Sequence, residues 1–417
     1  MNNIQAVIIT IGDELLIGQT IDTNSAWIAQ RLNHLGINVL RRVAVGDTRE
    51  AILNALDEEW LKASLIILTG GLGPTSDDIT KPLLCEYFGG TLTVNEEVAA
   101  HLKEIFGRRN RPILARNMKQ AEVPDNCTVL FNKLGTAPGM WFEKNGKIII
   151  SLPGVPFEMK HIMEVEALPR LKQLAEGDVI IHRTVFTAGE GESFIAERLM
   201  PFEAALPEHI KIAYLPDSGF VKIRLTGKGA EVAVLEAEMM NLQNQLVTTL
   251  GDIVIANEDV TLESLLGTTM QGNGKTFGFA ESCTGGYIGH LITQLPGSST
   301  YFKGSIVSYD NEVKENVLGV KKETIEQKGA VSEETVIEMA TGALKILNTD
   351  YTLAVSGVLG PDGGTERVKT GTVWMAVANK DRVLTKVQHF FYDRERNKEM
   401  AAKMGMLLLW KFINGKQ

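Results

Sequence analysis

Residues 65–80 read LIILTGGLGPTSDDIT, an aliphatic run that passes directly into a glycine-rich loop. The run from Leu65 to Thr69 is typical of a buried parallel strand. Because Gly70, Gly71 and Gly73 carry no side chain, their backbone amides can approach an anion closely, with a helix following. This order of strand, glycine loop and helix predicts an α/β sheet that binds its ligand at the carboxyl ends of the strands.

The same order recurs on the N-terminal side of this stretch. Residues 6–11 and 37–45 have the pattern of further strands, residues 24–35 and 51–62 that of helices, and residues 12–18 form a glycine-containing loop. Repetition of strand, loop and helix at intervals of roughly 30 residues is typical of a parallel sheet covered by helices. We expect this α/β domain to span residues 1–170.

Two further regions follow. Residues 171–255 combine strand patterns at 179–187 and 220–225 with one helix pattern at 231–250, which predicts a small α+β connector. Residues 256–417 return to alternating strands and helices. The predicted fold is therefore two α/β domains of three layers each, joined by a small α+β connector.

Composition narrows the class of protein. The chain of 417 residues carries a net charge of −9, which disfavours nucleic-acid binding. Its three cysteines suit a reducing compartment better than a disulfide framework. No apolar run approaches the roughly 20 residues that span a bilayer, and the first residues have the pattern of a buried strand rather than a secretion signal. We expect a cytoplasmic protein without a membrane span.

Carboxylates follow three of the predicted strands. Asp13 and Glu14 come after the first, Asp47 after the second, and Asp77 and Asp78 after the third. Oxygen ligands at neighbouring strand ends are able to hold a divalent cation, which would neutralise a pyrophosphate and activate water. Alternatively, Asp77 and Asp78 are simply favourable acids at a helix N-terminus.

A second candidate site lies in the last domain. Residues 280–286 read AESCTGG, which places the Ser282 hydroxyl and the Cys283 thiol at the end of a strand, facing the amides of the next helix. A cysteine nucleophile would use a base such as His290, whereas a serine would use Lys314, provided that burial keeps this lysine neutral. The alternative is that Lys314 is a surface residue of a helix.

The first domain resembles that of the CinA family, within the wider molybdopterin-binding fold. The resemblance rests on GDELLIGQTIDTN (12–24), VGDTRE (45–50), GGLGPTSDD (70–78) and LPGVPFEM (152–159). It implies a metal-dependent ADP-ribose pyrophosphatase with Asp78 and Asp47 as catalytic acids and Asp78, Asp77 and Glu14 as metal ligands. The substrate-binding residues implied there are Asn24, Gly70, Gly71, Gly73 and Thr75.

The last domain resembles the CinA C-terminal domain, which also occurs alone as nicotinamide mononucleotide (NMN) deamidase. The motifs are AESCTGG (280–286), PGSS (296–299), YFKGSIVSYDNEVK (301–314), GAVSEE (329–334) and GPDGGT (360–365) followed by GTVW (371–374). The resemblance implies Ser282 as nucleophile, Lys314 as general base and Tyr309 as a positioning residue, with no cofactor. The substrate-binding residues implied are Thr284, Gly285, Gly286, Ser298, Ser299, Gly363, Gly364, Thr365 and Arg394. Of these, Arg394 suits the phosphate because a guanidinium binds two oxygens at once.

The chain departs from this pattern at two positions. Lys369-Thr370-Gly371 stands where relatives commonly have Lys-Pro-Val-Gly, and Asp310 stands where a serine is usual. A carboxylate at Asp310 is expected to raise the pKa of the proposed lysine base.

Taken together, the two resemblances predict a homodimeric two-site enzyme for NMN and ADP-ribose. The alternatives are a competence- or DNA-damage-linked binding protein, and a molybdopterin-binding protein.

Overall fold

The computed structural model describes residues 4–108, 110–174 and 179–416. These residues fall into two compact units: residues up to 182 together with 208–210 and 226–239, and the remainder of the chain. No helix of the described residues is both long and apolar enough to cross a membrane.

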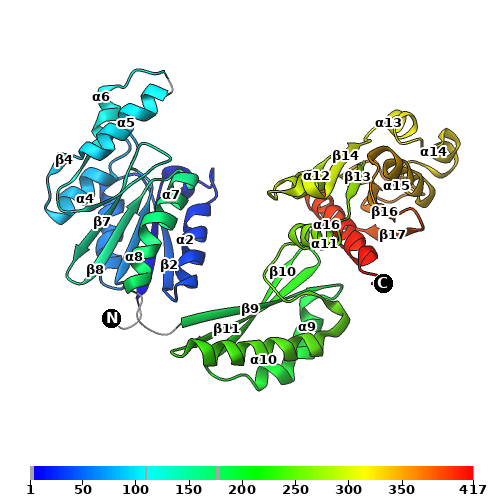
Figure 1. Ribbon diagram of the computed structural model, residues 1–417, viewed down its shortest axis with the longest axis horizontal. Coiled ribbons are helices and arrows are strands. Elements are labelled where there is room, and N and C mark those ends of the chain that lie inside the picture. The colour runs from blue at the N-terminus through cyan, green and yellow to red at the C-terminus, as the bar shows by residue number, and fades with distance from the viewer. Residues whose placement is uncertain (1–3, 109, 175–178, 417) are drawn as a thin grey trace. The chain divides into compact units, whose positions relative to one another are not determined.

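The first domain is a six-stranded sheet in the order β2-β1-β3-β8-β7-β6 (Figure 1). Strands β1, β2, β3 and β8 run parallel, and β6 and β7 are antiparallel to their neighbours. Its strands are β1 (Gln5–Ile11), β2 (Asn38–Val45), β3 (Leu65–Thr69), β6 (Thr128–Leu130), β7 (Gly139–Lys144) and β8 (Lys147–Leu152), with a separate pair β4 (Leu92–Val94) and β5 (Glu122–Pro124). Its helices are α1 (Asp13–Leu16), α2 (Thr23–His34), α3 (Arg49–Trp60), α4 (Thr80–Phe88), α5 (Glu96–Arg108), α6 (Ala115–Met118), η1 (Lys119–Ala121), α7 (Pro156–Ile162), the π-helical η2 (Met163–Ala167) and α8 (Leu168–Leu174).

Both faces of this sheet are covered. Ile28 and Leu32 of α2 pack with residues of α7 and α8 against one face of β1, β3 and β8. Ile52 and Leu56 of α3, with Leu84 of α4, cover the other face. Burial on both sides explains why β3 is aliphatic throughout, and the three-layer prediction is confirmed.

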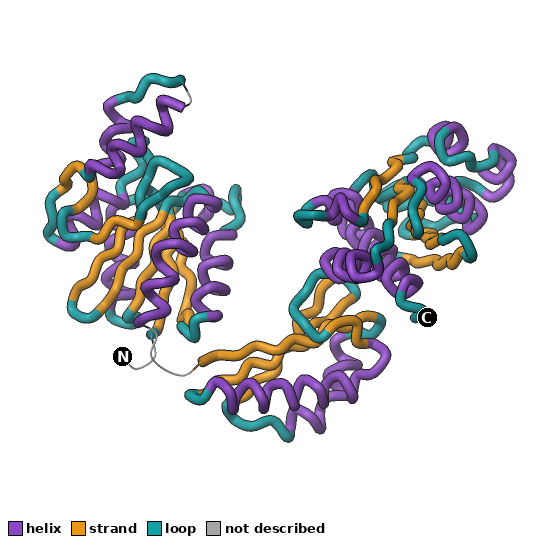
Figure 2. The backbone as a smooth tube through the Cα atoms, in the orientation of Figure 1, coloured by secondary structure: helices purple, strands orange, loops and turns teal. Residues whose placement is uncertain are grey.

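The connector region contains a four-stranded sheet in the order β10-β11-β9-β12. Its elements are β9 (Val179–Ala188), α9 (Glu192–Ala204), β10 (Ile210–Asp217), β11 (Phe220–Gly229), α10 (Val232–Leu250), η3 (Gly251–Ile253) and β12 (Val254–Ala256). Figure 2 shows strands and helices combined here, as the predicted α+β connector requires.

The last domain is a five-stranded sheet in the order β14-β13-β15-β16-β17. Helices α11, α12 and α16 supply the buried side chains on one face, and α15 covers the other. The strands are β13 (Phe277–Glu281), β14 (Phe302–Val307), β15 (Tyr351–Gly357), β16 (Thr372–Ala378) and β17 (Val383–His389). The helices are α11 (Leu262–Asn273), α12 (Tyr287–Thr293), η4 (Ser298–Thr300), α13 (Asn311–Asn316), α14 (Lys322–Lys328), α15 (Glu333–Leu347) and α16 (Arg394–Ile413).

Candidate functional site

The carboxylate loops after β1 and β2 meet at the edge of the first sheet. Ile11 pairs with Val45 at the parallel strand ends, so the residues that follow lie side by side. The Asp47 carboxylate accepts the backbone N–H of Asp13 at 3.0 Å, and the Asp13 carboxylate accepts that of Asp47 at 3.2 Å. A Cβ on Gly46 would lie 2.5 Å from Asp13 Oδ1, so a side chain at this position would displace the Asp13 carboxylate from Asp47. The predicted loop 12–18 also contains the short helix α1, with Asp13 and Glu14 in its only turn.

Negative charge accumulates around Asp47. Burial raises the pKa of the Asp47 carboxyl, and the nearby carboxylates of Asp13, Glu14 and Asp77 raise it further, against the opposing hydrogen bond from Asp13. Carboxylate oxygens crowded in this way are suitable ligands for a hard divalent cation. In the part of the chain that the structure describes, however, no three His, Cys, Asp or Glu side chains are grouped as a metal site. Asp13, Glu14, Asp47 and Asp77 are therefore the residues of this edge that could contribute one or two carboxylate ligands to a cation.

Asp78 is engaged in its own loop. Its Oδ2 accepts the backbone N–H of Thr75 at 2.8 Å and also the Thr75 hydroxyl. A Cβ on Gly73 would come within 2.5 Å of this carboxylate. Asp78 therefore closes the turn between the glycine loop and α4, and it does not cap this helix, which begins at Thr80 with no acid in its first turn.

Asn24 lines a cavity of about 110 Å³ beside these loops, together with Glu14, Ile21, Thr69 and Gly154. Its side-chain amide donates to the Gly154 carbonyl at 2.7 Å and to Thr69 Oγ1 at 3.2 Å. Its Oδ1 is buried with no hydrogen-bond partner among the described residues. A buried acceptor without a donor is costly, so this atom suits a donor group on a ligand.

The last domain brings Ser282 and Lys314 to one edge of its sheet. The Ser282 amide donates to the Val355 carbonyl at 3.0 Å, and the Ser308 amide donates to the Glu281 carbonyl at 2.8 Å, so the ends of β13, β14 and β15 are joined. Lys314 lies on α13, one turn beyond this junction, and is only 1% exposed. The interpretation of Lys314 as a surface residue is therefore wrong.

Burial governs the charge of this lysine. Desolvation lowers the pKa of Lys314 below its usual value, although Asp310 and Cys283 act in the opposite direction. The predicted influence of Asp310 thus has the expected sign but is smaller than that of burial. Among the described residues, the hydrogen bond of Lys314 Nζ runs to the Tyr309 carbonyl at 3.2 Å, with no carboxylate in an ion pair. A lysine in this environment is able to accept a proton.

Cys283 has the opposite character. Burial raises the pKa of its thiol to about 12, which keeps the sulfur protonated at neutral pH. His290 is exposed on α12, with its Nε2 2.9 Å from Gln294 Nε2. Because a thiolate is the reactive form of cysteine, the buried, protonated thiol of Cys283 is a poor nucleophile.

Glu281, which the sequence analysis did not single out, occupies the N-terminus of α12. This fully buried carboxylate accepts the amides of Gly286, Ile288 and Gly289 at 2.9–3.0 Å and the Ser305 hydroxyl at 2.7 Å. The Gly286 amide is therefore bonded within the protein, contrary to the expectation that it meets a substrate anion. An acid shortly before a helix is the sequence signal that would have revealed this cap.

Two hydroxyls near Ser282 remain unpaired. Thr284 Oγ1 and Ser308 Oγ are buried without a hydrogen-bond partner in the described part of the chain, and the Ser282 side chain is itself 8% exposed. Thr284 was predicted to bind substrate, whereas Ser308 was not identified. Gly285, in the same turn, has φ +60° and open space where a Cβ would lie.

Tyr309 and Arg394 contact each other at this edge. The Arg394 guanidinium donates to the Tyr309 hydroxyl at 3.0 Å and to the Gly360 carbonyl at 2.7 Å. Tyr309 is 59% exposed, so its link to Lys314 runs through its main-chain carbonyl and not its ring. The loop with Gly363, Gly364 and Thr365 follows β15 at the same edge, where Thr365 Oγ1 accepts the Val368 amide.

Ser298 and Ser299 lie elsewhere. They form η4, which immediately precedes β14, at the end of the sheet opposite to Ser282. Within this chain they are not brought to the serine. Their role in substrate binding was implied by the resemblance to the CinA C-terminal domain and not by their position after a strand.

A larger cavity, of about 730 Å³, lies beside β16 and β17 and contains neither Ser282 nor Lys314. Lys369 and Thr370, where the chain departs from the family pattern, line this cavity together with Trp374, His389 and Phe391.

Comparison with known proteins agrees with this architecture. Residues 7–173 match the family model "Probable molybdopterin binding domain", residues 182–256 "Damage-inducible protein CinA KH domain", and residues 259–413 "CinA C-terminal domain". A CinA-like protein of Cytophaga hutchinsonii is 46% identical over 400 residues, covering 96% of each chain. The chain belongs to the CinA family.

A second full-length relative and a shorter solved structure are also similar to this chain. A CinA-like protein of Flavobacterium psychrophilum is 43% identical over 98% of both chains. Among solved structures, a protein described as competence or damage-inducible from Enterobacter asburiae is 31% identical, covering 36% of this chain and 96% of its own, with a TM-score of 0.36.

Proposed function

We propose that this CinA family member is a two-site hydrolase of NAD-derived nucleotides. Its last domain would deamidate NMN, and its first would cleave the pyrophosphate of ADP-ribose with a divalent metal. The NMN deamidase proposal is supported by the buried Lys314. Desolvation lowers the pKa of this lysine, and its amine is held by a neutral carbonyl.

In the deamidase, neutral Lys314 would take the proton of the Ser282 hydroxyl as Oγ attacks the carboxamide carbon of NMN. The C–N bond then breaks, and the nitrogen leaves as ammonia with the proton that Lys314 returns. Water, deprotonated by the same amine, would cleave the resulting ester to nicotinic acid mononucleotide and restore the serine. Arg394, whose guanidinium is placed beside Gly360 and Tyr309 by two hydrogen bonds, would hold the phosphate.

In the first domain, a divalent cation would neutralise the pyrophosphate and activate water. The charge crowded around Asp47 supports this part of the proposal, because Asp13, Glu14 and Asp77 all raise the pKa of that carboxyl. Asp47, with Glu14, Asp77 or Asp78, would hold the ion, and the glycine loop would approach the phosphates. The unpaired Asn24 Oδ1 would accept a hydrogen bond from a ribose hydroxyl.

The test uses the full-length chain with each substrate. Ammonia is measured with NMN, and AMP is measured with ADP-ribose in the presence of Mg²⁺ or Mn²⁺. Ser282→Ala should abolish ammonia release and leave AMP release unchanged, whereas Asp47→Asn should do the reverse. Cys283→Ala is the matched control for the nucleophile, and it should retain deamidase activity.

The competing function is a binding protein linked to competence or DNA damage; the Enterobacter asburiae relative is described as competence or damage-inducible. A wild-type chain that releases neither ammonia nor AMP would favour this alternative. If Cys283→Ala were inactive and Ser282→Ala active, the serine mechanism would be wrong.

A further inference from the structure

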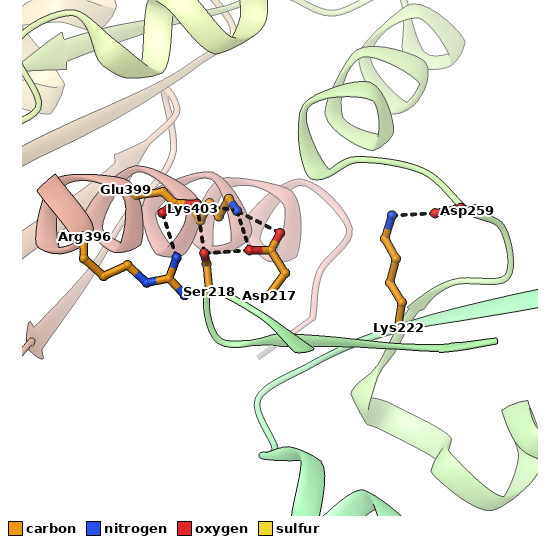
Figure 3. Close-up of polar contacts among 7 residues, drawn as sticks. All are labelled: Asp217, Ser218, Lys222, Asp259, Arg396, Glu399 and Lys403. Atoms are coloured by element: carbon orange, nitrogen blue, oxygen red, sulfur yellow. Dashed lines mark hydrogen bonds and ion pairs between the residues drawn. The ribbon is translucent and has the colours of Figure 1, made fainter. Parts of the chain in front are cut away.

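The deamidase domain receives a contact from the connector sheet that does not touch Ser282 or Lys314. The turn between β10 and β11 meets the side of helix α16 through Asp217, Ser218 and Gly219 (Figure 3). Ser218 is only 4% exposed and adopts φ +49°, an uncommon conformation for a residue other than glycine. The turn is therefore packed against the helix and does not project into solvent.

Charged side chains fix the turn. Lys403 Nζ lies 2.9 Å from Asp217 Oδ2 and 2.8 Å from Glu399 Oε1, while Ser218 Oγ lies 2.9 Å from the same glutamate oxygen. The other oxygen of Glu399 accepts from Arg396 at 2.9 Å. The side chains of Lys403 and Glu399 are 16% and 26% exposed, whereas that of Asp217 is 65% exposed, so the network is shielded from solvent on the helix and open to it at Asp217.

Apolar packing continues the same contact. Phe186, Ala188 and Phe220 of the connector sheet belong to one buried cluster with residues of α16 such as Ala402 and Met406. A Cβ on Gly219 would lie 3.0 Å from Met404 Cε, so the turn itself lies against the helix. The connector and this face of the helix therefore share a core.

The first turn of α16 holds the substrate edge of the domain. Arg394 bonds the Gly360 carbonyl and the Tyr309 hydroxyl. Asn397, 1% exposed, donates to the Leu359 carbonyl at 2.9 Å. Lys403 lies nine residues after Arg394, so roughly 14 Å of one helix joins the hairpin contact to the Gly360 loop.

We propose that the hairpin turn 217–219 is a positioning element for the deamidase site and acts through α16 on Arg394 and the Gly360 loop. The expected change in NMN kinetics rests on the proposed NMN deamidase function. The expected effect of the turn on α16 and on the Gly360 loop does not. We call three residues positioning residues and not catalytic residues: Asp217, Ser218 and Lys403. Their side-chain hydrogen bonds are with one another and with Glu399, and not with Ser282, Lys314 or Arg394.

The chain contains a matched control. Lys222, on the same hairpin, pairs with Asp259 at 2.6 Å, and Asp259 precedes α11 rather than lying on α16 (Figure 3). Lys222→Met thus removes this ion pair and the cation–π contact of Lys222 with Phe186, but it leaves the contacts of Asp217 and Ser218 with α16 in place.

The experiment compares Asp217→Asn, Lys403→Met and the milder Ser218→Ala with Lys222→Met and wild type. Amide hydrogen exchange is followed in peptides covering residues 357–362 and 392–398, with circular dichroism to verify that each variant is folded. NMN kinetics are measured in parallel. We expect faster exchange at both segments in the first three variants only. We expect KM for NMN to rise about tenfold in Lys403→Met, with kcat changed less than about twofold, because α16 holds the phosphate side and not the Ser282–Lys314 pair.

Exchange that stays at the level of Lys222→Met in all three folded variants would overturn the proposal, as would a fall in kcat with KM unchanged. If the wild type releases no ammonia from NMN, the deamidase proposal fails, and the exchange data alone decide whether the hairpin positions the loop.

Discussion

The amine of Lys314 donates a 3.2 Å hydrogen bond to the main-chain carbonyl of Tyr309. A neutral carbonyl accepts a hydrogen bond from either an ammonium or a free amine, so the contact holds the side chain without requiring a positive charge. Burial then lowers the pKa of Lys314, and the Asp310 carboxylate, at the N-cap of the same helix, together with Cys283 partly restores it. The proton affinity of the proposed base is therefore set by two opposing effects.

Replacing Asp310 should shift the pH dependence of the deamidase. In Asp310→Asn the carboxylate that raises the Lys314 pKa is absent, so the lysine loses its proton at lower pH. The rising limb of kcat/KM for NMN should move to lower pH, with higher activity at neutral pH. Asparagine is also a good N-cap, so α13 should persist.

Glu312→Gln is the control for this experiment. Glu312 lies in the first turn of the same helix, but its carboxylate is not among the groups that shift the Lys314 pKa. A profile of Asp310→Asn that matches the control, or that moves to higher pH, would contradict the electrostatic account.

Glu281→Gln should destabilise the last domain. The buried carboxylate accepts three backbone amides and one hydroxyl, and a glutamine side chain offers only one acceptor oxygen for these four donors. Hydrogen bonds to a charged group contribute about 1.5–3 kcal/mol, so we expect a loss of about 2–4 kcal/mol in the free energy of unfolding. Urea denaturation measures this loss.

Glu263→Gln, in the first turn of α11, provides the comparison for Glu281. Glu263 is partly exposed, and its substitution should change stability by less than about 0.5 kcal/mol. Equal effects of the two substitutions would show that the cap of α12 contributes no more than a surface glutamate.

Strands were easier to predict than the long C-terminal helix. The boundaries predicted for β1 and β3 agree with the structure to within one residue, since each is a largely apolar run that ends directly before a glycine. Helix α16 was not predicted, because Gly405–Trp410 are all buried and thus show no apolar stripe of helical period. Strand β17 is largely exposed and equally lacks a buried alternation.

The positions of the site residues in the sheets could be predicted in the same way as the strands. The sequence predicted which strand ends carry Asp47, Asp78 and Ser282, because the position of a loop after a strand fixes its sheet edge. It did not predict how individual polar atoms pair. The role of Glu281 depends on a bend that directs its side chain toward the next helix, and the contact between Arg394 and Tyr309 joins residues 85 positions apart.

Gly73→Ala tests the glycine loop without a backbone penalty, because Gly73 does not have positive φ. The added Cβ would lie 2.5 Å from Asp78 Oδ2, which must move and release Thr75. Because a carboxylate moves easily, stability should fall by less than about 1 kcal/mol, while AMP release from ADP-ribose should fall at least about tenfold. NMN deamidation is the internal control. Unchanged AMP release would exclude a need for this placement of Asp78.

Asp47→Asn should separate stability from activity in the first domain. Burial and three neighbouring carboxylates raise the pKa of Asp47 in the folded state, so its ionised form is destabilising at pH values above that pKa. Without metal, removing the charge should increase the free energy of unfolding by at most about 1 kcal/mol and raise the melting temperature slightly. This gain should vanish in acid, where Asp47 is protonated in the wild type. Adding Mg²⁺ should stabilise the wild type, since a ligand that binds only the folded state raises its melting temperature, and should not stabilise the variant. Calorimetry at several pH values, with and without Mg²⁺, measures both effects. A variant that is stabilised by Mg²⁺ as strongly as the wild type would show that Asp47 does not hold the ion.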